Sequence, residues 1–177
     1  MIALSLIKLG ELSLKPGDEP SLITATALIE EGLARVTEMG DQPARAYALH
    51  DLGFAALLRG DRSKARKHYN ESLELSRALD DKLKVVMNLE ALAIVQGKNA
   101  LASGNRASAV RNAGRAVQLY TAIGSVRGQS SLAVKERHYR ATMDLVLGLL
   151  SDDELSEYQA LGQQMSLDEA VSFAKAN

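Results

Sequence analysis

ALLRGDRSKARKHYNESLELSRALDD, residues 56–81, ends one apolar helical run at Gly60-Asp61 and begins another at once. Glycine accepts the left-handed conformation that closes a helix, and aspartate caps the helix that follows. Apolar residues recur at spacings of three and four on both sides of this turn, which is typical of amphipathic helices. The stretch is therefore predicted to be a helical hairpin, which either occurs once in the chain or is one copy of a repeat.

The same pattern of glycines occurs three times along the chain. In each segment one glycine lies inside the first helix and a second closes that helix seven residues later, as in Gly10 and Gly17, Gly53 and Gly60, and Gly97 and Gly104. Small residues then recur at matched offsets in the second helix, beginning at Ala25, Ala65 and Ala109. Small side chains at matched places let helices approach closely, so the chain is predicted to be an array of helical hairpins.

The whole chain is predicted to be all-α. Its three prolines occur by residue 43, strong helix formers dominate, and no convincing alternating strand run is found. The expected architecture is a stack of antiparallel helix pairs closed by short C-terminal capping helices. The predicted helices cover residues 2–14, 21–39, 43–59, 62–79, 82–103, 106–123, 129–149, 152–161 and 167–175.

Each of the last two predicted helices has a start signal, because Ser151 with Glu154 and Ser166 with Glu169 have the spacing of a capping box. The first predicted helix has no such signal, and its helical spacing of apolar residues already begins at residue 2. This suggests that the sequence is a piece of a longer protein. We expect one domain overall, made of repeats at 1–41, 42–81 and 82–127 and a C-terminal helix with capping helices at 128–177.

The stretch ALHDLGFAALLRGDRSKARKHYNESLEL, residues 48–75, resembles a tetratricopeptide repeat. The resemblance is carried by Leu52-Gly53 in the first helix and by Ala65, Tyr69 and Ser72 in the second. Leu49 stands where an aromatic is usual, the proline after the second helix is missing, and the repeats exceed the typical length of about 34 residues. These departures fit a divergent subgroup with longer helices, and the resemblance implies a right-handed superhelical stack.

Residues 47–81 and the closing GQQMSLDEAVSFAKAN, residues 162–177, are similar to the C-terminal arrays of MalT-like and LuxR-type bacterial transcription regulators and related predicted ATPases. The resemblance implies a non-catalytic sensor module that binds a protein, peptide or effector and alters an attached ATPase. These residues contain neither a phosphate-binding G-x-x-x-x-G-K-[ST] loop nor a recognisable helix-turn-helix signature, so such parts would lie outside them.

In arrays of this kind the first helix of each pair lines the concave binding face. An apolar cluster at Tyr47, Phe54 and Leu57, edged by charge, would suit an amphipathic helix or an extended peptide. Alternatively, the helices at 129–175 fold back over this face and make the same residues core; the sequence leaves both readings open. The predicted groove residues are Ile7, Glu11, Tyr47, His50, Phe54, Leu57, Ile94, Lys98 and Leu101.

Composition argues against several other classes of function. The net charge of −1 gives no global attraction to nucleic acid or to an anionic membrane, and the basic run at 59–68 is interleaved with acids, as on a solvated helix face. The chain has no cysteine, and its three histidines lack a convincing metal-binding spacing. Without a G-x-S-x-G motif, a secretory signal or an 18-residue apolar run, we expect a cytoplasmic chain with no enzymatic activity, cofactor or metal.

The alternative function is a free-standing scaffold that self-associates. The first helix presents a row of aliphatic residues and has no polar cap of the kind that terminal repeats require, so a homodimer through this N-terminal edge is plausible. The residues concerned are Ile2, Leu4, Leu6, Ile7 and Leu9.

Overall fold

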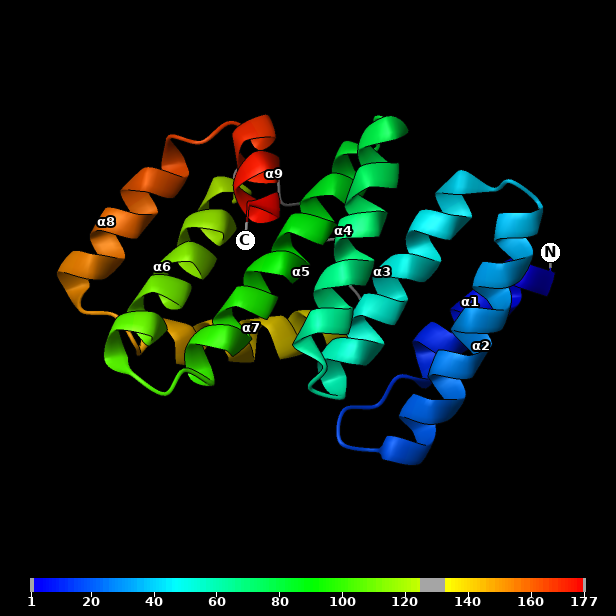
Figure 1. Ribbon diagram of the computed structural model, residues 1–177. Helices are drawn as coiled ribbons and strands as arrows, with labels where there is room; N and C mark the ends of the chain where they lie inside the picture. The colour runs from blue at the N-terminus through cyan, green and yellow to red at the C-terminus, as the bar shows by residue number, and fades with distance from the viewer. Residues whose placement is uncertain (1, 125–132, 177) are drawn as a thin grey trace. The chain divides into compact units, whose positions relative to one another are not determined.

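The computed structural model describes residues 2–124 and 133–176, and within these ranges the regular structure is entirely α-helical (Figure 1). The predicted all-α class is confirmed, as is the packing of adjacent helices in pairs. The helices are α1 (Ile2–Ser13), α2 (Glu19–Glu38), α3 (Gln42–Leu58), α4 (Arg62–Ala78), α5 (Lys82–Leu101), α6 (Arg106–Ala122), α7 (Ala133–Leu147), α8 (Asp152–Gln163) and α9 (Leu167–Lys175).

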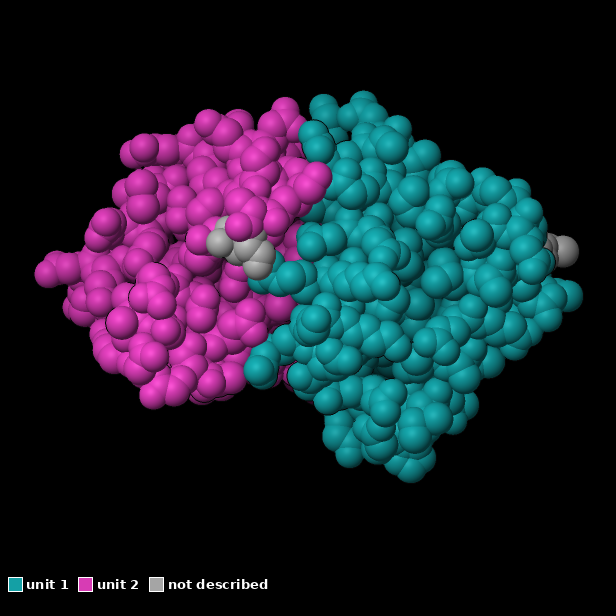
Figure 2. All heavy atoms as spheres, in the orientation of Figure 1, with its two compact units in different colours: residues 1–82 teal, residues 83–177 magenta. Residues whose placement is uncertain are grey.

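The chain divides into two compact units, Met1–Lys82 and Leu83–Asn177 (Figure 2). Helices α1 to α4 make up the first unit, and almost all of α5 with α6 to α9 makes up the second. The division lies one residue from the predicted boundary between the second and third segments, 81/82. The expectation of one domain overall stays a prediction.

In the first unit, α1 and α2 pack closely through two reciprocal glycines. A Cβ added to Gly10 would lie 2.5 Å from Cγ1 of Ile29, and one added to Gly32 would lie 2.5 Å from Cγ1 of Ile7. No larger residue fits at either place without displacing its neighbour. The small residues found by self-comparison therefore bring these two backbones together, as the repeat pattern predicts.

The second pair, α3 and α4, is built around Gly53 and Tyr69. The ring of Tyr69 is fully buried and lies against the backbone of Gly53, where a Cβ would be 2.6 Å from Cε1. The buried Ser72 hydroxyl donates a hydrogen bond to the carbonyl oxygen of Ala46, at 2.8 Å. Since α2 also packs against α3, the two pairs of this unit stack in chain order.

The turns of the first unit follow the predicted chemistry. Asp18, Asp41 and Asp61 each accept a hydrogen bond from a backbone N–H of the next helix. The glycines at the helix ends have the expected positive φ of 69 to 81° at positions 17, 40 and 60. The predicted turn at Gly104-Asn105 differs, because Asn105 caps α6 while Gly104 keeps a φ that any residue can adopt.

The second unit uses its glycines differently. Gly97 of α5 meets Val146 of α7, where a Cβ would be 2.8 Å from Cγ2. Gly114 of α6 lies under the ring of Tyr158 of α8, and Gly162 of α8 lies against the α6 backbone at Gln118. Figure 1 shows α8 running alongside α6. Close backbone approach at Gly97 was expected, but its partner is α7 rather than the neighbouring α6.

The last helices begin where the sequence predicts. At the start of α8, Glu154 accepts a hydrogen bond from the Ser151 N–H at 2.8 Å, while the Glu154 N–H donates to the Ser151 hydroxyl at 3.3 Å. The same capping box occurs at Ser166 and Glu169 in α9. The predicted helix at 129–149 begins outside the described residues. Of its described part, residues 133–147 form α7, and Gly148 and Leu149 lie in the turn that follows.

Among the described residues, no helix combines the length and the apolar character needed to cross a membrane.

Candidate protein-interaction surface

Most of the predicted groove residues in the first unit are core residues. Ile7, His50, Phe54 and Leu57 are each at most 5% exposed. Tyr47 is half-exposed, and Glu11 is partly buried and forms an ion pair with Lys8 at 2.7 Å. The predicted apolar cluster of Tyr47, Phe54 and Leu57 is therefore not an open groove, since only its tyrosine reaches the surface.

In the second unit the predicted face of α5 is covered by α7. Ile94 is completely buried, Lys98 is half-buried, and Leu101 is exposed at the end of the helix. Gly97, on the same face as these residues, contacts Val146 of α7. In this unit the structure matches the second of the two predicted arrangements, in which C-terminal helices fold back over the first-helix face.

The three histidines lie in separate environments. His50 is buried, with its ring 5.3 Å from the ring of Tyr69. Burial lowers the pKa of His68, and burial together with the charge of Lys98 lowers the pKa of His138. Within the described residues, no three side chains of His, Cys, Asp or Glu gather in a way that could hold a metal ion.

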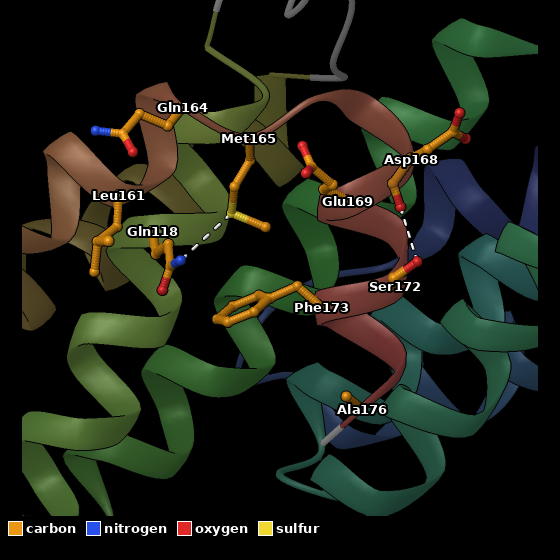
Figure 3. Close-up of a pocket in the computed structure, with 9 residues that line it drawn as sticks. All are labelled: Gln118, Leu161, Gln164, Met165, Asp168, Glu169, Ser172, Phe173 and Ala176. Atoms are coloured by element: carbon orange, nitrogen blue, oxygen red, sulfur yellow. Dashed lines mark hydrogen bonds between the residues drawn. The ribbon is translucent and has the colours of Figure 1, made fainter.

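The structure contains an open groove that the sequence did not predict. It has a volume of about 730 Å³ and lies where α6, the end of α8 and α9 meet (Figure 3). We call it the C-terminal groove. Its lining residues are Gln118 from α6, Leu161 from α8, Gln164 and Met165 from the turn, and Asp168, Glu169, Ser172, Phe173 and Ala176 from α9 and its end.

Phe173 is the main apolar anchor of the C-terminal groove. It projects from α9 toward α6, as Figure 3 shows, and remains partly exposed. The guanidinium carbon of Arg115 lies 4.5 Å from the centre of its ring, within the range of a cation–π interaction. One face of the ring is therefore held by α6, which fixes its orientation before any partner arrives.

Two further apolar side chains complete the lining. The Gln118 side-chain amide donates a weak hydrogen bond to the sulfur of Met165, at 3.4 Å, so the thioether is held over the groove (Figure 3). Leu161 of α8 is 41% exposed on the same side as Gln118. The methionine side chain adapts readily to the shape of an incoming apolar group, and the leucine adds apolar surface, as peptide-binding grooves require.

The edge of the groove near the start of α9 is acidic. The Ser166 N–H and hydroxyl both donate to one carboxylate oxygen of Glu169, each at 2.7 Å. These hydrogen bonds lower the pKa of Glu169, which therefore stays ionised well into the acidic range. Asp168 precedes it, and among the described residues that line the groove none is lysine or arginine.

The sequence contained a partial signal for this site. The capping box at Ser166 predicts α9, but from its spacing alone the helix is expected only to cap the array. Its inward face is made of Ala170, Val171 and Ala174, all buried. Phe173 lies beside that face and is one of two phenylalanines in the chain, so a large aromatic at the edge of a short amphipathic helix was the available clue.

No family model matches the chain, and neither a curated protein nor a solved structure matches it.

Proposed function

We propose that this chain is a non-catalytic protein-interaction module and that the C-terminal groove binds a short segment of a protein partner. The observation that supports this most directly is the open space surrounded by Leu161, Met165 and Phe173. Apolar side chains around a groove of this kind lose contact with water when a partner's side chains enter it, and this burial favours binding.

The polar groups of the groove support binding rather than chemistry. The Glu169 carboxylate accepts the Ser166 N–H in the capping box of α9, and the Gln118 amide donates to the Met165 sulfur. A helix with apolar residues at spacings of three and four, or an extended segment, would place apolar anchors against Phe173. Because Asp168 and Glu169 lie at the start of α9 while the Arg115 guanidinium stacks on Phe173, the favoured partner has lysine or arginine at the α9 edge of the groove and not next to the anchor on Phe173.

The resemblance supports a wider setting for this function. Residues 47–81 and 162–177 are similar to the C-terminal arrays of ATPase-type transcription regulators, and both Met165 and Phe173 lie within the second stretch. We therefore propose that the chain is the sensor region of such a cytoplasmic regulator, in which occupation of the groove alters the state of the attached ATPase.

A peptide selection tests the proposal directly. The chain is immobilised and a displayed library of peptides about 15 residues long is selected against it. We expect enriched peptides to carry spaced apolar anchors with flanking basic residues, and to lose at least about tenfold in affinity with Phe173→Ala, which corresponds to about 1.4 kcal/mol.

A matched control separates loss of the site from loss of the fold. Leu145 is 60% exposed on α7 and does not line the groove, so Leu145→Ala should leave peptide affinity unchanged. Circular dichroism should show the same helix content for both variants. Selected peptides that bind Phe173→Ala and Leu161→Ala as tightly as the unaltered chain would refute the proposal.

A further inference from the structure

Helix α1 has large aliphatic side chains exposed to solvent. Ile2 is 67% exposed, Leu9 54% and Leu12 63%. Scattered single exposed leucines are ordinary on a protein surface, but this helix of 12 residues exposes four large aliphatic side chains, since Leu4 is also 53% exposed. Exposed apolar side chains gathered in this way are typical of interaction surfaces.

The direction of this patch follows from the contacts of α1. Ala3, Ile7 and Gly10 are buried, and Ile7 and Gly10 pack against α2. Helix α1 also contacts α3. Lys8 and Glu11 lie on that side of α1, where the Asp51 carboxylate of α3 contributes to the raised pKa of Lys8, after the larger effect of the Glu11 hydrogen bond. Helices α2 and α3 therefore account for two sides of α1.

The remaining side of α1 is mostly aliphatic, with the uncharged Ser5 beside Ile2 and Leu9. Ile2, Leu6 and Leu9 follow one another at spacings of four and three, which places them on one face of the helix. Leu12 adjoins Leu9 one turn further on. We call Ile2, Leu6, Leu9 and Leu12 the α1 face. Since it points away from the α2 and α3 contacts, the packing described for the first unit does not account for it.

We propose that the chain self-associates through the α1 face, with α1 of one copy packed against α1 of a second copy across a two-fold axis. The proposal does not rest on the C-terminal groove, which belongs to the other unit. In a two-fold interface the same patch serves both partners, so the patch must be complementary to itself.

The α1 face meets that requirement. It contains no charged side chain, and its nearest charges, Lys8 and Glu11, neutralise each other in an ion pair of 2.7 Å. A second copy therefore meets no like charge on the face. Aliphatic residues at spacings of three and four, as here, can interdigitate with an identical row on a facing helix.

The size of the face sets the expected strength. A helix of 12 residues is about 18 Å long, so two such helices bury less than the roughly 800 Å² per partner of a standard stable interface. We therefore expect a weak dimer, with a dissociation constant of about 10 to 100 µM.

Sedimentation equilibrium over a range of concentrations from about 5 to about 500 µM tests the proposal. The average mass should rise from 19.0 kDa toward twice that value, and Leu9→Glu should keep it at the lower value throughout. Leu145→Glu, at an equally exposed leucine in the other unit, should still dimerise. A chain that stays monomeric at the highest concentration, or an equal effect of both substitutions, would overturn the proposal.

Cysteine cross-linking locates the contact and covers the case in which the charged variant fails to fold. The chain has no cysteine, so each single substitution reports on one position only. Mild oxidation of Leu6→Cys or Leu9→Cys at high concentration should give a disulfide-linked dimer, whereas Leu145→Cys should give little. If the mass doubles but neither Leu6→Cys nor Leu9→Cys forms the disulfide-linked dimer, the chain dimerises through another surface. That result would refute dimerisation through the α1 face.

Discussion

Asp80 holds the place at the end of α4 that Gly40 holds at the end of α2. Both have left-handed backbone angles, with φ of 53° for Asp80 and 69° for Gly40. In both turns the N–H of this residue donates to the carbonyl oxygen of the residue three positions earlier, at 3.1 Å. The N–H of the aspartate that follows donates to the carbonyl oxygen five positions before it, at 2.9 Å. The turn is thus the same, although an aspartate has replaced the glycine.

This equivalence predicts that Asp80→Gly stabilises the protein. A side chain in the left-handed region crowds the backbone, which glycine avoids, although glycine loses more freedom on folding. We expect a net gain of about 0.5–1 kcal/mol, seen as a higher urea midpoint. The reciprocal change, Gly40→Asp, should lower the midpoint by a similar amount. A lower midpoint for Asp80→Gly would contradict the expectation.

Gly53→Ala should destabilise the α3–α4 pair. The added methyl group would lie 2.6 Å from the ring of Tyr69, which is fully buried and cannot swing into solvent. Overpacking of this kind costs about 1–3 kcal/mol, measurable in urea unfolding. Gly104→Ala is the matched control, because a Cβ there has no neighbour within 4 Å and the backbone angle is unstrained. Equal effects at the two positions would argue against the close contact.

Arg106 links three helices of the second unit. Its guanidinium, at the start of α6, donates to the carbonyl oxygen of Leu149 after α7 and to Glu154 of α8, the latter at 3.1 Å. Arg106→Ala should cost at most about 1 kcal/mol, since the side chain is largely exposed. Hydrogen exchange should speed up at the start of α8. Arg111→Ala, whose partner Ser108 lies on its own helix, should leave that exchange unchanged.

The protein should lose stability on mild acidification. Burial lowers the pKa values of His68 and His138 below the ordinary 6.5, so the unfolded chain binds protons that the folded chain resists. Stability is then full above pH 6.5 and falls as the pH drops through the lowered values. We expect the urea midpoint to fall between pH 7.5 and 5, and to fall less in His68→Gln and His138→Gln. If the urea midpoint of both variants falls with pH as steeply as that of the wild-type protein, groups other than these two histidines cause the acid sensitivity.

The local features of the fold could be predicted because their causes are local. A capping box such as Ser151 with Glu154 is completed by residues within one turn, so the sequence alone is sufficient to find it. The same holds for the turns at Gly40 and Gly60, where backbone angle and cap depend on adjacent residues.

The partners of the helices could not be predicted in the same way. Gly53 and Gly97 carry the same signal, a small residue inside a helix, yet one meets the next helix and the other meets α7. A glycine inside a helix indicates that another segment of the chain packs closely against it, but it does not identify that segment. The C-terminal groove was missed for the same reason, since Phe173 and Gln118 are far apart in sequence and only tertiary packing makes them neighbours.

The arrangement of hydrogen bonds in the two units has a consequence for the order of folding. In the first unit the Ser72 hydroxyl reaches back 26 residues to Ala46, whereas in the second unit Arg106 reaches forward 43 and 48 residues to Leu149 and Glu154. Closing longer loops costs more entropy and slows folding. During synthesis the partners of the first unit's long-range hydrogen bond are both made by residue 72, whereas Arg106 of α6 meets its partners Leu149 and Glu154 only when most of the chain has been made.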